Sequence, residues 1–202
     1  SSNGKYAAAM THTSSPVRQT ALVTFDPTKS NSLEEIMLST SEQLWPLALN
    51  SAVPELLFAR SSMGDQIALL EVVSLDKDAE PRVLISEGAV YGGAAWNPDG
   101  SMLAYISSET GQFEAYVASY SADGLGKVNL VSNGSVEALG WTQEGGGLLG
   151  LRWISDHTEY MRAVSRVGTR ITLGPIVETG RVLDKDEINF AVDLDGGIYT
   201  IR

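Results

Sequence analysis

The feature that most constrains the fold of this chain is an internal repeat with a period of 45 to 47 residues. Residues 50–70 align without a gap on residues 97–117, an offset of 47, and Trp141 aligns with Trp96 at an offset of 45. Each unit holds several short apolar runs separated by turn signals, and this period is the size of a four-stranded propeller blade. The sequence therefore predicts an all-β fold, a β-propeller of four-stranded blades with about four to five blades visible. Either the chain closes a small ring or it is part of a larger propeller.

The repeat divides the chain into five successive units that we expect to form a single propeller domain or a fragment of one. Their approximate boundaries are 1–40, 41–87, 88–134, 135–180 and 181–202. The middle three look complete, with outer strands expected near Val83–Ile85, Val128–Val131 and Thr172–Ile176. Because a blade packs on both faces against its neighbours, its inner strands should be apolar on both sides, as in the run 56–59.

One segment of the first unit also has the pattern of a helix. Ser32-Leu33-Glu34-Glu35 has the form of a capping box and precedes an apolar run, which Pro46 would end. The alternative is that residues 35–39 form the outer strand of the first blade. We expect the strand, because the repeat requires one there.

The third unit resembles the TolB-like propeller repeat. The resemblance rests on Trp96-Asn97-Pro98-Asp99-Gly100-Ser101, then on Leu103-Ala104-Tyr105-Ile106-Ser107, Gly111 and Tyr116-Val117. In the turn, Pro fixes φ, Asp bonds backbone amides and Gly takes a positive φ. We expect Trp96 to pack between adjacent blades. The match is fair at Trp141–Gly145 and weak elsewhere.

The resemblance implies a fold shared by several kinds of protein, and function does not follow from it. Such propellers occur in periplasmic protein-interaction modules, in sensor regions of regulators and as the substrate-gating domain of prolyl-oligopeptidase-like serine peptidases. We therefore expect a non-catalytic scaffold, recognition or sensor module in a periplasmic or other extracytoplasmic setting, although a cytoplasmic one also fits. The alternative is the gating propeller of a serine peptidase whose catalytic domain is absent from this chain.

The charge balance restricts the class of partner. With 14 basic and 25 acidic side chains, the net charge is −11, which disfavours binding to nucleic acid or to anionic membrane surfaces. No apolar run approaches the roughly 20 residues of a membrane span, so we expect no direct membrane insertion. A protein or peptide partner is expected, and a basic one suits the acidic chain best.

Catalytic and metal-binding patterns are weak. The chain has no cysteine, which excludes disulfides, zinc–thiolate sites and cysteine nucleophiles. It contains no Gly-x-Ser-x-Gly elbow, and only His12 and His157 could serve as a histidine base, so an enzyme is disfavoured. We expect no cofactor. The exception to test is calcium near Asp193 and Asp195, a segment that reads more simply as an Asp-Gly hairpin turn.

Partner-binding residues are expected in loops that converge on the mouth of the propeller channel. The repeat places residues 60–63, 107–110 and 152–157 at equivalent loop positions. An exposed Trp beside an Arg has the composition of an interface hot spot. The predicted partner-binding residues are Arg152, Trp153, Asp156, His157 and Arg60. The alternative is that Trp153 packs within its blade and Arg152 is only solvated.

Overall fold

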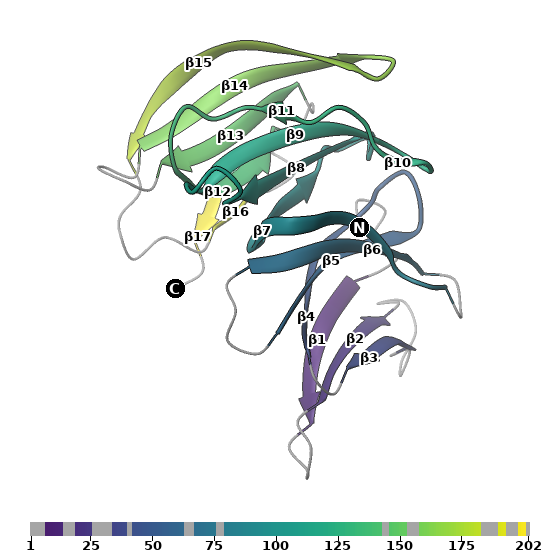
Figure 1. The fold of residues 1–202 in the computed structure, drawn as a ribbon. Helices are drawn as coiled ribbons and strands as arrows, with labels where there is room; N and C mark the ends of the chain where they lie inside the picture. Colours follow the sequence, from purple (N-terminus) through teal and green to yellow (C-terminus); the bar gives the residue numbers. More distant parts are fainter. Residues whose placement is uncertain are drawn as a thin grey trace. The chain divides into compact units, whose positions relative to one another are not determined.

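The chain folds as a succession of antiparallel β-sheets (Figure 1). The computed structural model describes residues 7–13, 19–25, 34–39, 42–62, 67–75, 79–142, 146–152, 158–182, 190–192 and 198–200. All the regular secondary structure within these ranges is β-strand, which confirms the predicted all-β class. The chain divides into two compact units, Ser1–Gly92 and Gly93–Arg202.

The first sheet of the first unit has three strands in sequence order. They are β1 (Ala7–Thr13), β2 (Gln19–Phe25) and β3 (Glu34–Ser39). The strand expected over 35–39 is therefore confirmed and the helical alternative is wrong. Strand β3 pairs with β2, so its backbone N–H and C=O groups form hydrogen bonds in the sheet instead of in a helix.

The second sheet begins with β4 (Glu42–Leu49), β5 (Glu55–Ser62) and β6 (Ile67–Ser74). Strand β4 packs against β1, β2 and β3 of the sheet before it, and its Pro46 lies at a register shift, where the missing N–H is tolerated. The side chains of residues 56–59 in β5 are all 0% exposed, which confirms that an inner strand is buried on both faces. Leu44, Leu56 and Phe58 form one core cluster with Val73.

Strand β7 (Arg82–Trp96) is long because it belongs to both units. Its first part, from Arg82 to Val90, pairs with β6 and includes the outer strand predicted over 83–85. Its last residues lie in the second unit, where β7 is the neighbour of β8 (Met102–Ser107).

The second unit continues this order. β8 pairs with β9 (Glu114–Ser121), and β9 also pairs with the short strands β10 (Gly124–Leu125) and β11 (Asn129–Leu130). The next sheet is four-stranded, with β12 (Val136–Trp141), β13 (Gly147–Arg152), β14 (Thr158–Val167) and β15 (Arg170–Val182) in sequence order. A final hairpin joins β16 (Phe190–Val192) to β17 (Ile198–Thr200).

Successive sheets in the second unit pack through their first strands. β12 packs against β8 and β9 of the preceding sheet, and β16 packs against β12. The indole Nε1 of Trp141, on β12, donates a hydrogen bond to the carbonyl oxygen of Ala95 on β7, at 3.0 Å. The same relation holds between β4 and the first sheet. Each sheet therefore presents its first strand to the sheet before it, which is how propeller blades pack.

A glycine permits close approach of β7 to β8. Gly93 is buried, and a Cβ added there would lie 2.7–2.9 Å from side-chain carbons of Ile106. We expect Gly93→Ala to lower the free energy of unfolding by about 1–3 kcal/mol, because the Ile106 side chain must shift in a well-packed site. Urea unfolding measures this. Gly146→Ala is the matched control, since its added Cβ meets nothing within 4 Å, and equal stabilities for the two variants would contradict the prediction.

Candidate functional site

The three loops predicted to start at residues 60, 107 and 152 begin later than expected, because these three residues still belong to strands. Arg60 lies near the end of β5, Ser107 ends β8, and Arg152 ends β13. The backbone of Arg152 is described but its side chain is not, while Trp153, Asp156 and His157 lie outside the described residues. Their roles in partner binding stay predictions.

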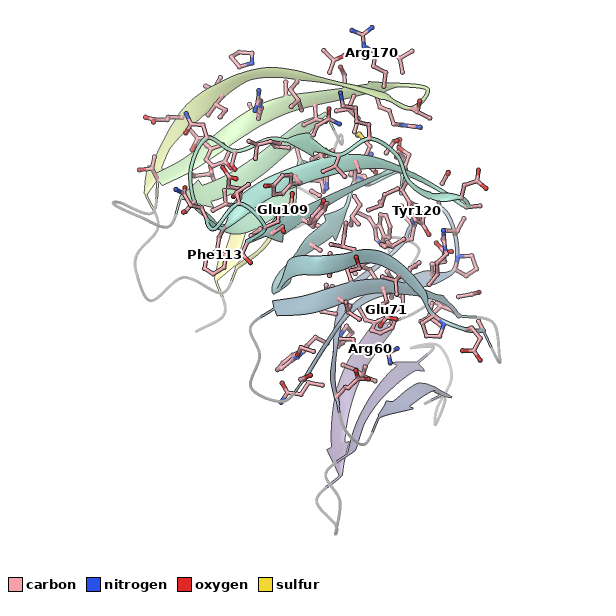
Figure 2. All side chains as sticks on the ribbon, viewed as in Figure 1. Arg60, Glu71, Glu109, Phe113, Tyr120 and Arg170 are labelled. Atoms are coloured by element: carbon pink, nitrogen blue, oxygen red, sulfur yellow. The ribbon has the colours of Figure 1, made fainter. Side chains whose placement is uncertain are left out.

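Arg60 is held by two carboxylates on neighbouring strands. Figure 2 labels Arg60 and one of these partners, Glu71. Its Nε donates to Glu71 Oε2 at 2.5 Å, and its Nη1 donates to Glu42 Oε2 at 3.1 Å. Burial lowers the pKa of Arg60, but the two carboxylates outweigh it and raise the pKa above its ordinary value. Glu71 is only 5% exposed, so the guanidinium supplies the charge that lets a buried carboxylate stay in the sheet. This is a structural role, and the predicted binding role of Arg60 is not tested by it.

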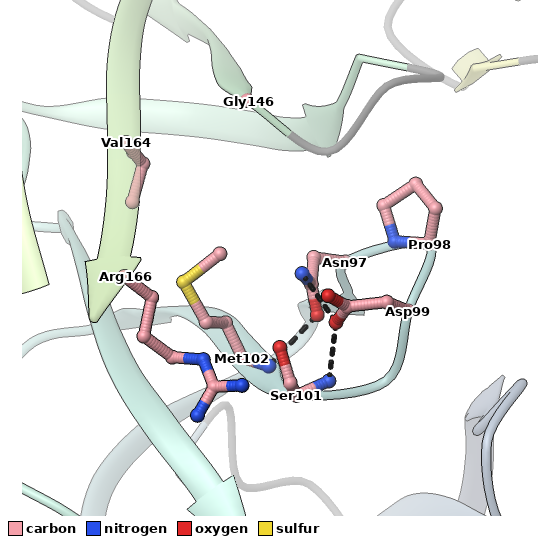
Figure 3. A pocket seen from close by; sticks show the side chains of 8 residues that line it. All are labelled: Asn97, Pro98, Asp99, Ser101, Met102, Gly146, Val164 and Arg166. Carbon is pink, nitrogen blue, oxygen red and sulfur yellow. Dashed lines mark hydrogen bonds between the residues drawn. The ribbon is translucent and has the colours of Figure 1, made fainter. Parts of the chain in front are cut away.

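A hollow of about 260 Å³ lies within the second unit, between the sheet of β8 and the sheet of β13 (Figure 3). On one side it is lined by the β7–β8 turn, through Asn97, Pro98, Asp99, Ser101 and Met102. On the other side it is lined by Gly146, just before β13, and by Val164 and Arg166 near the end of β14. We call this hollow the turn pocket.

The β7–β8 turn is fixed by a dense set of hydrogen bonds. Asn97 Oδ1 accepts from the Met102 amide at 2.7 Å, and Asn97 Nδ2 donates to Asp99 Oδ1 at 2.8 Å. Asp99 Oδ1 also accepts from the Ser101 amide at 2.9 Å, while Gly100 has a φ of 71°. The roles assigned to Asp99 and Gly100 from the sequence are therefore confirmed. Asn97 is 3% exposed, so its side chain holds the turn from a buried position.

The turn pocket carries one ionic group of each sign. Partial burial raises the pKa of Asp99, but hydrogen bonds from Ser101 and Asn97 and the charge of Arg166 leave the pKa below its ordinary 3.8. Asp99 is therefore a carboxylate at neutral pH. Arg166 is exposed and donates from Nη1 to the carbonyl oxygen of Gly168 at 2.8 Å. Met102 and Val164, which are 4% and 2% exposed, add apolar surface.

The lowered pKa of Asp99 gives a measurable pH dependence. Because the folded-state pKa lies below the ordinary one, the ionised group adds stability at neutral pH, and this is lost as the pH falls through the folded-state pKa. A carbon-detected NMR titration should place the Asp99 pKa below 3.8, and Arg166→Gln should raise it. A wild-type pKa at or above 3.8, or no change in the variant, would contradict this account.

Sequence reasoning missed the turn pocket, although a signal for it existed. The pattern of residues 97–101 predicts only a turn, and nothing in the sequence singles out Arg166. In an antiparallel sheet the first and third turns lie at the same edge. The β7–β8 turn and the β14–β15 turn at Gly168 are such turns of adjacent sheets. They lie at the opposite end of the strands from the predicted loop 107–110.

Metal-binding clusters and membrane-spanning helices are not found in the described part of the chain. Among the described residues, no three His, Asp or Glu side chains come together to hold a metal ion. Asp193 and Asp195 lie outside that part, so calcium near them stays a prediction. The described residues include no helix long and apolar enough to cross a membrane.

Comparisons with known proteins identify the fold. No protein-family model and no curated protein matches the sequence. Among solved structures, TolB from Acinetobacter baumannii is 16% identical with a TM-score of 0.60, over 89% of this chain and 52% of that one. The β-propeller domain of Cps50 (Swd1) from Myceliophteria thermophila is 12% identical with a TM-score of 0.50, over 80% and 56%.

A third similar structure belongs to a protein from Bacteroides ovatus that is assigned as a dipeptidyl aminopeptidase IV. It is 13% identical with a TM-score of 0.53, over 95% of this chain and 36% of that one. The chain thus spans about half the length of the two propeller proteins and about a third of the peptidase-like protein. At these identities the likeness shows the fold alone: the chain has the fold of β-propeller blades, and it is similar to TolB and to a second propeller domain.

Proposed function

We propose that this chain is a TolB-like propeller module that binds a protein or peptide partner in the turn pocket, without catalysis of its own and in an extracytoplasmic setting. The observation that carries the proposal is the turn pocket, which combines a carboxylate, a guanidinium and apolar side chains in one hollow. A few placed polar groups over an apolar surface are what recognition sites use to fix orientation and specificity.

The rigidity of the turn supports a binding role. The side chain of Asn97 and the carboxylate of Asp99 bind backbone amides within the turn, so the wall is formed before a partner arrives. A preformed wall lowers the ordering cost of association, since fewer side chains lose freedom on binding.

Selection of a random 12-residue peptide library on the immobilised chain tests this proposal. We expect a family of related peptides to be enriched and to bind reversibly. Gly146→Trp should abolish their binding, because residue 146 lines the turn pocket and its Cβ position is open, so the indole can fill the hollow. Thr172→Trp, at an exposed position of β15, should bind normally. Failure to enrich peptides, or full binding by Gly146→Trp, would overturn the proposal.

A second candidate is the substrate-gating propeller of a serine peptidase. It is favoured by the likeness to the protein assigned as a dipeptidyl aminopeptidase IV, which covers 95% of this chain. A fluorophosphonate probe, which labels activated serine nucleophiles, distinguishes the candidates when applied to the full natural gene product. Labelling would support the peptidase, whereas its absence together with peptide binding by this chain would support the recognition module.

A further inference from the structure

We infer that the turn pocket selects a basic side chain of the partner peptide, Lys or Arg, whose cation pairs with Asp99 while its aliphatic stem lies on Met102 and Val164. This inference rests on the proposed function, since it names the residue class that the peptide places in the pocket. The sequence alone does not predict this pairing, because Asp99 and Val164 belong to different sheets and both line the hollow.

The carboxylate of Asp99 is held ready for an external cation. Its Oδ1 accepts from both Asn97 Nδ2 and the Ser101 amide, which fixes the plane of the group on the pocket wall (Figure 3). Both of these bonds are accepted by Oδ1, and Asp99 lines the hollow. A bond from an ammonium or guanidinium to such a carboxylate is charge-assisted and stronger than a neutral hydrogen bond.

The size and lining of the turn pocket fit one long side chain. Its volume of about 260 Å³ is below the roughly 300–1,000 Å³ of typical small-molecule pockets. Met102 and Val164 offer apolar contact beside the carboxylate, and Pro98 adds an apolar ring at the rim. Lys and Arg have this character, an aliphatic stem that covers apolar surface and a charged head that reaches a polar group.

Arg166 does not reverse the preference of the turn pocket for a basic side chain. An acidic occupant could pair with Arg166, but that side chain is exposed and already donates to Gly168, whereas Asp99 is fixed by two bonds. The net charge of −11 also attracts a basic partner and repels an acidic one. Arg166 therefore opposes the cation weakly, and its removal should tighten binding of a basic peptide while the loss of Asp99 weakens it.

The test repeats the random 12-residue peptide selection on four proteins: the unchanged chain, Asp99→Asn, Asp123→Asn and Arg166→Gln. Asn at position 99 keeps one acceptor oxygen for the Ser101 amide but replaces the charged second oxygen with an NH2 donor, which cannot accept from a cation. Asp123→Asn removes the same charge from an exposed turn outside the turn pocket, and so controls for net charge. We expect Lys and Arg to be enriched on the unchanged chain and on Asp123→Asn. Calorimetry should show the selected peptides binding Asp99→Asn about tenfold or more weakly.

Arg166→Gln distinguishes the loss of an opposing charge from damage to the turn pocket. We expect this variant to bind the same peptides about two- to threefold more tightly, whereas a damaged pocket would bind them more weakly. Peptides that bind without basic enrichment, or equally to Asp99→Asn, would overturn the inference and leave the proposed function standing. Acidic enrichment that is lost in Arg166→Gln would overturn it in the same way. If no peptide binds the unchanged chain, both fail.

Discussion

Replacement of Arg60 with methionine is expected to lower the free energy of unfolding by about 3–5 kcal/mol, because it leaves a buried charge without its partner. Glu71 has a side chain that is 6% exposed and accepts a hydrogen bond from Arg60 Nε. Methionine keeps most of the apolar stem of Arg60, so the loss reports the missing cation rather than a cavity. Chemical denaturation at neutral pH measures the change.

Two further variants separate the ion pair from its surroundings. Glu42→Gln should cost only about 0–1 kcal/mol, since Glu42 has a side chain that is 36% exposed and pairs with Arg60 near solvent. In the double variant Arg60→Met, Glu71→Met, much of the lost stability should return, because no charge then stays buried. If the single Arg60→Met variant is within about 1 kcal/mol of the unchanged chain in stability, Glu71 does not depend on Arg60.

Truncation of Trp141 to alanine is expected to destabilise the second unit by about 3–5 kcal/mol. Trp141 is 6% exposed and joins β12 to the preceding sheet through its bond to Ala95. Trp141→Phe keeps most of the apolar contact and leaves the Ala95 carbonyl without that donor, so it should cost about 1–3 kcal/mol. Thermal and urea unfolding measure both variants.

Trp96 is the matched control for the hydrogen bond. It is 8% exposed, its ring centroid lies 4.4 Å from that of Tyr120, and its Nε1 has no hydrogen-bond partner in the described part of the chain. Trp96→Phe therefore loses contact area but no hydrogen bond, and should be less destabilising than Trp141→Phe. If the two changes cost the same, the bond to Ala95 does not contribute to the packing of successive sheets.

Much of the fold could be predicted from the sequence because it follows from local patterns that recur. The repeat located the apolar second strands, and the turn residues Asp99 and Gly100 defined the hairpin between β7 and β8. The repeat also favoured a strand over residues 35–39 against a local helical pattern, because strand pairing in the sheet outweighs a capping box. The continuity of β7 through both units was not predicted, since the sequence places an apparent blade boundary between residues 87 and 88.

The turn pocket could not be predicted in the same way. Asp99 and Arg166 are far apart in the sequence and come together only because two adjacent sheets bring their turns to the same edge. The contacts of Arg60 could not be predicted for a different reason, which is the register of the strands. The repeat predicts a loop at residues 60–63, but Arg60 lies within β5, and the register that brings Glu71 and Glu42 to its guanidinium depends on pairing across three strands.

The most direct measurement is an amide chemical-shift map of the ¹⁵N-labelled chain with and without a peptide recovered by selection. The account predicts shifts that concentrate on residues 97–102, Gly146 and residues 164–166, with the Ser101 amide, which donates to Asp99, among the largest. Shifts that instead centre on the loop 107–113 would move the binding site to the opposite end of β8. That result would contradict the assignment of the turn pocket as the recognition site.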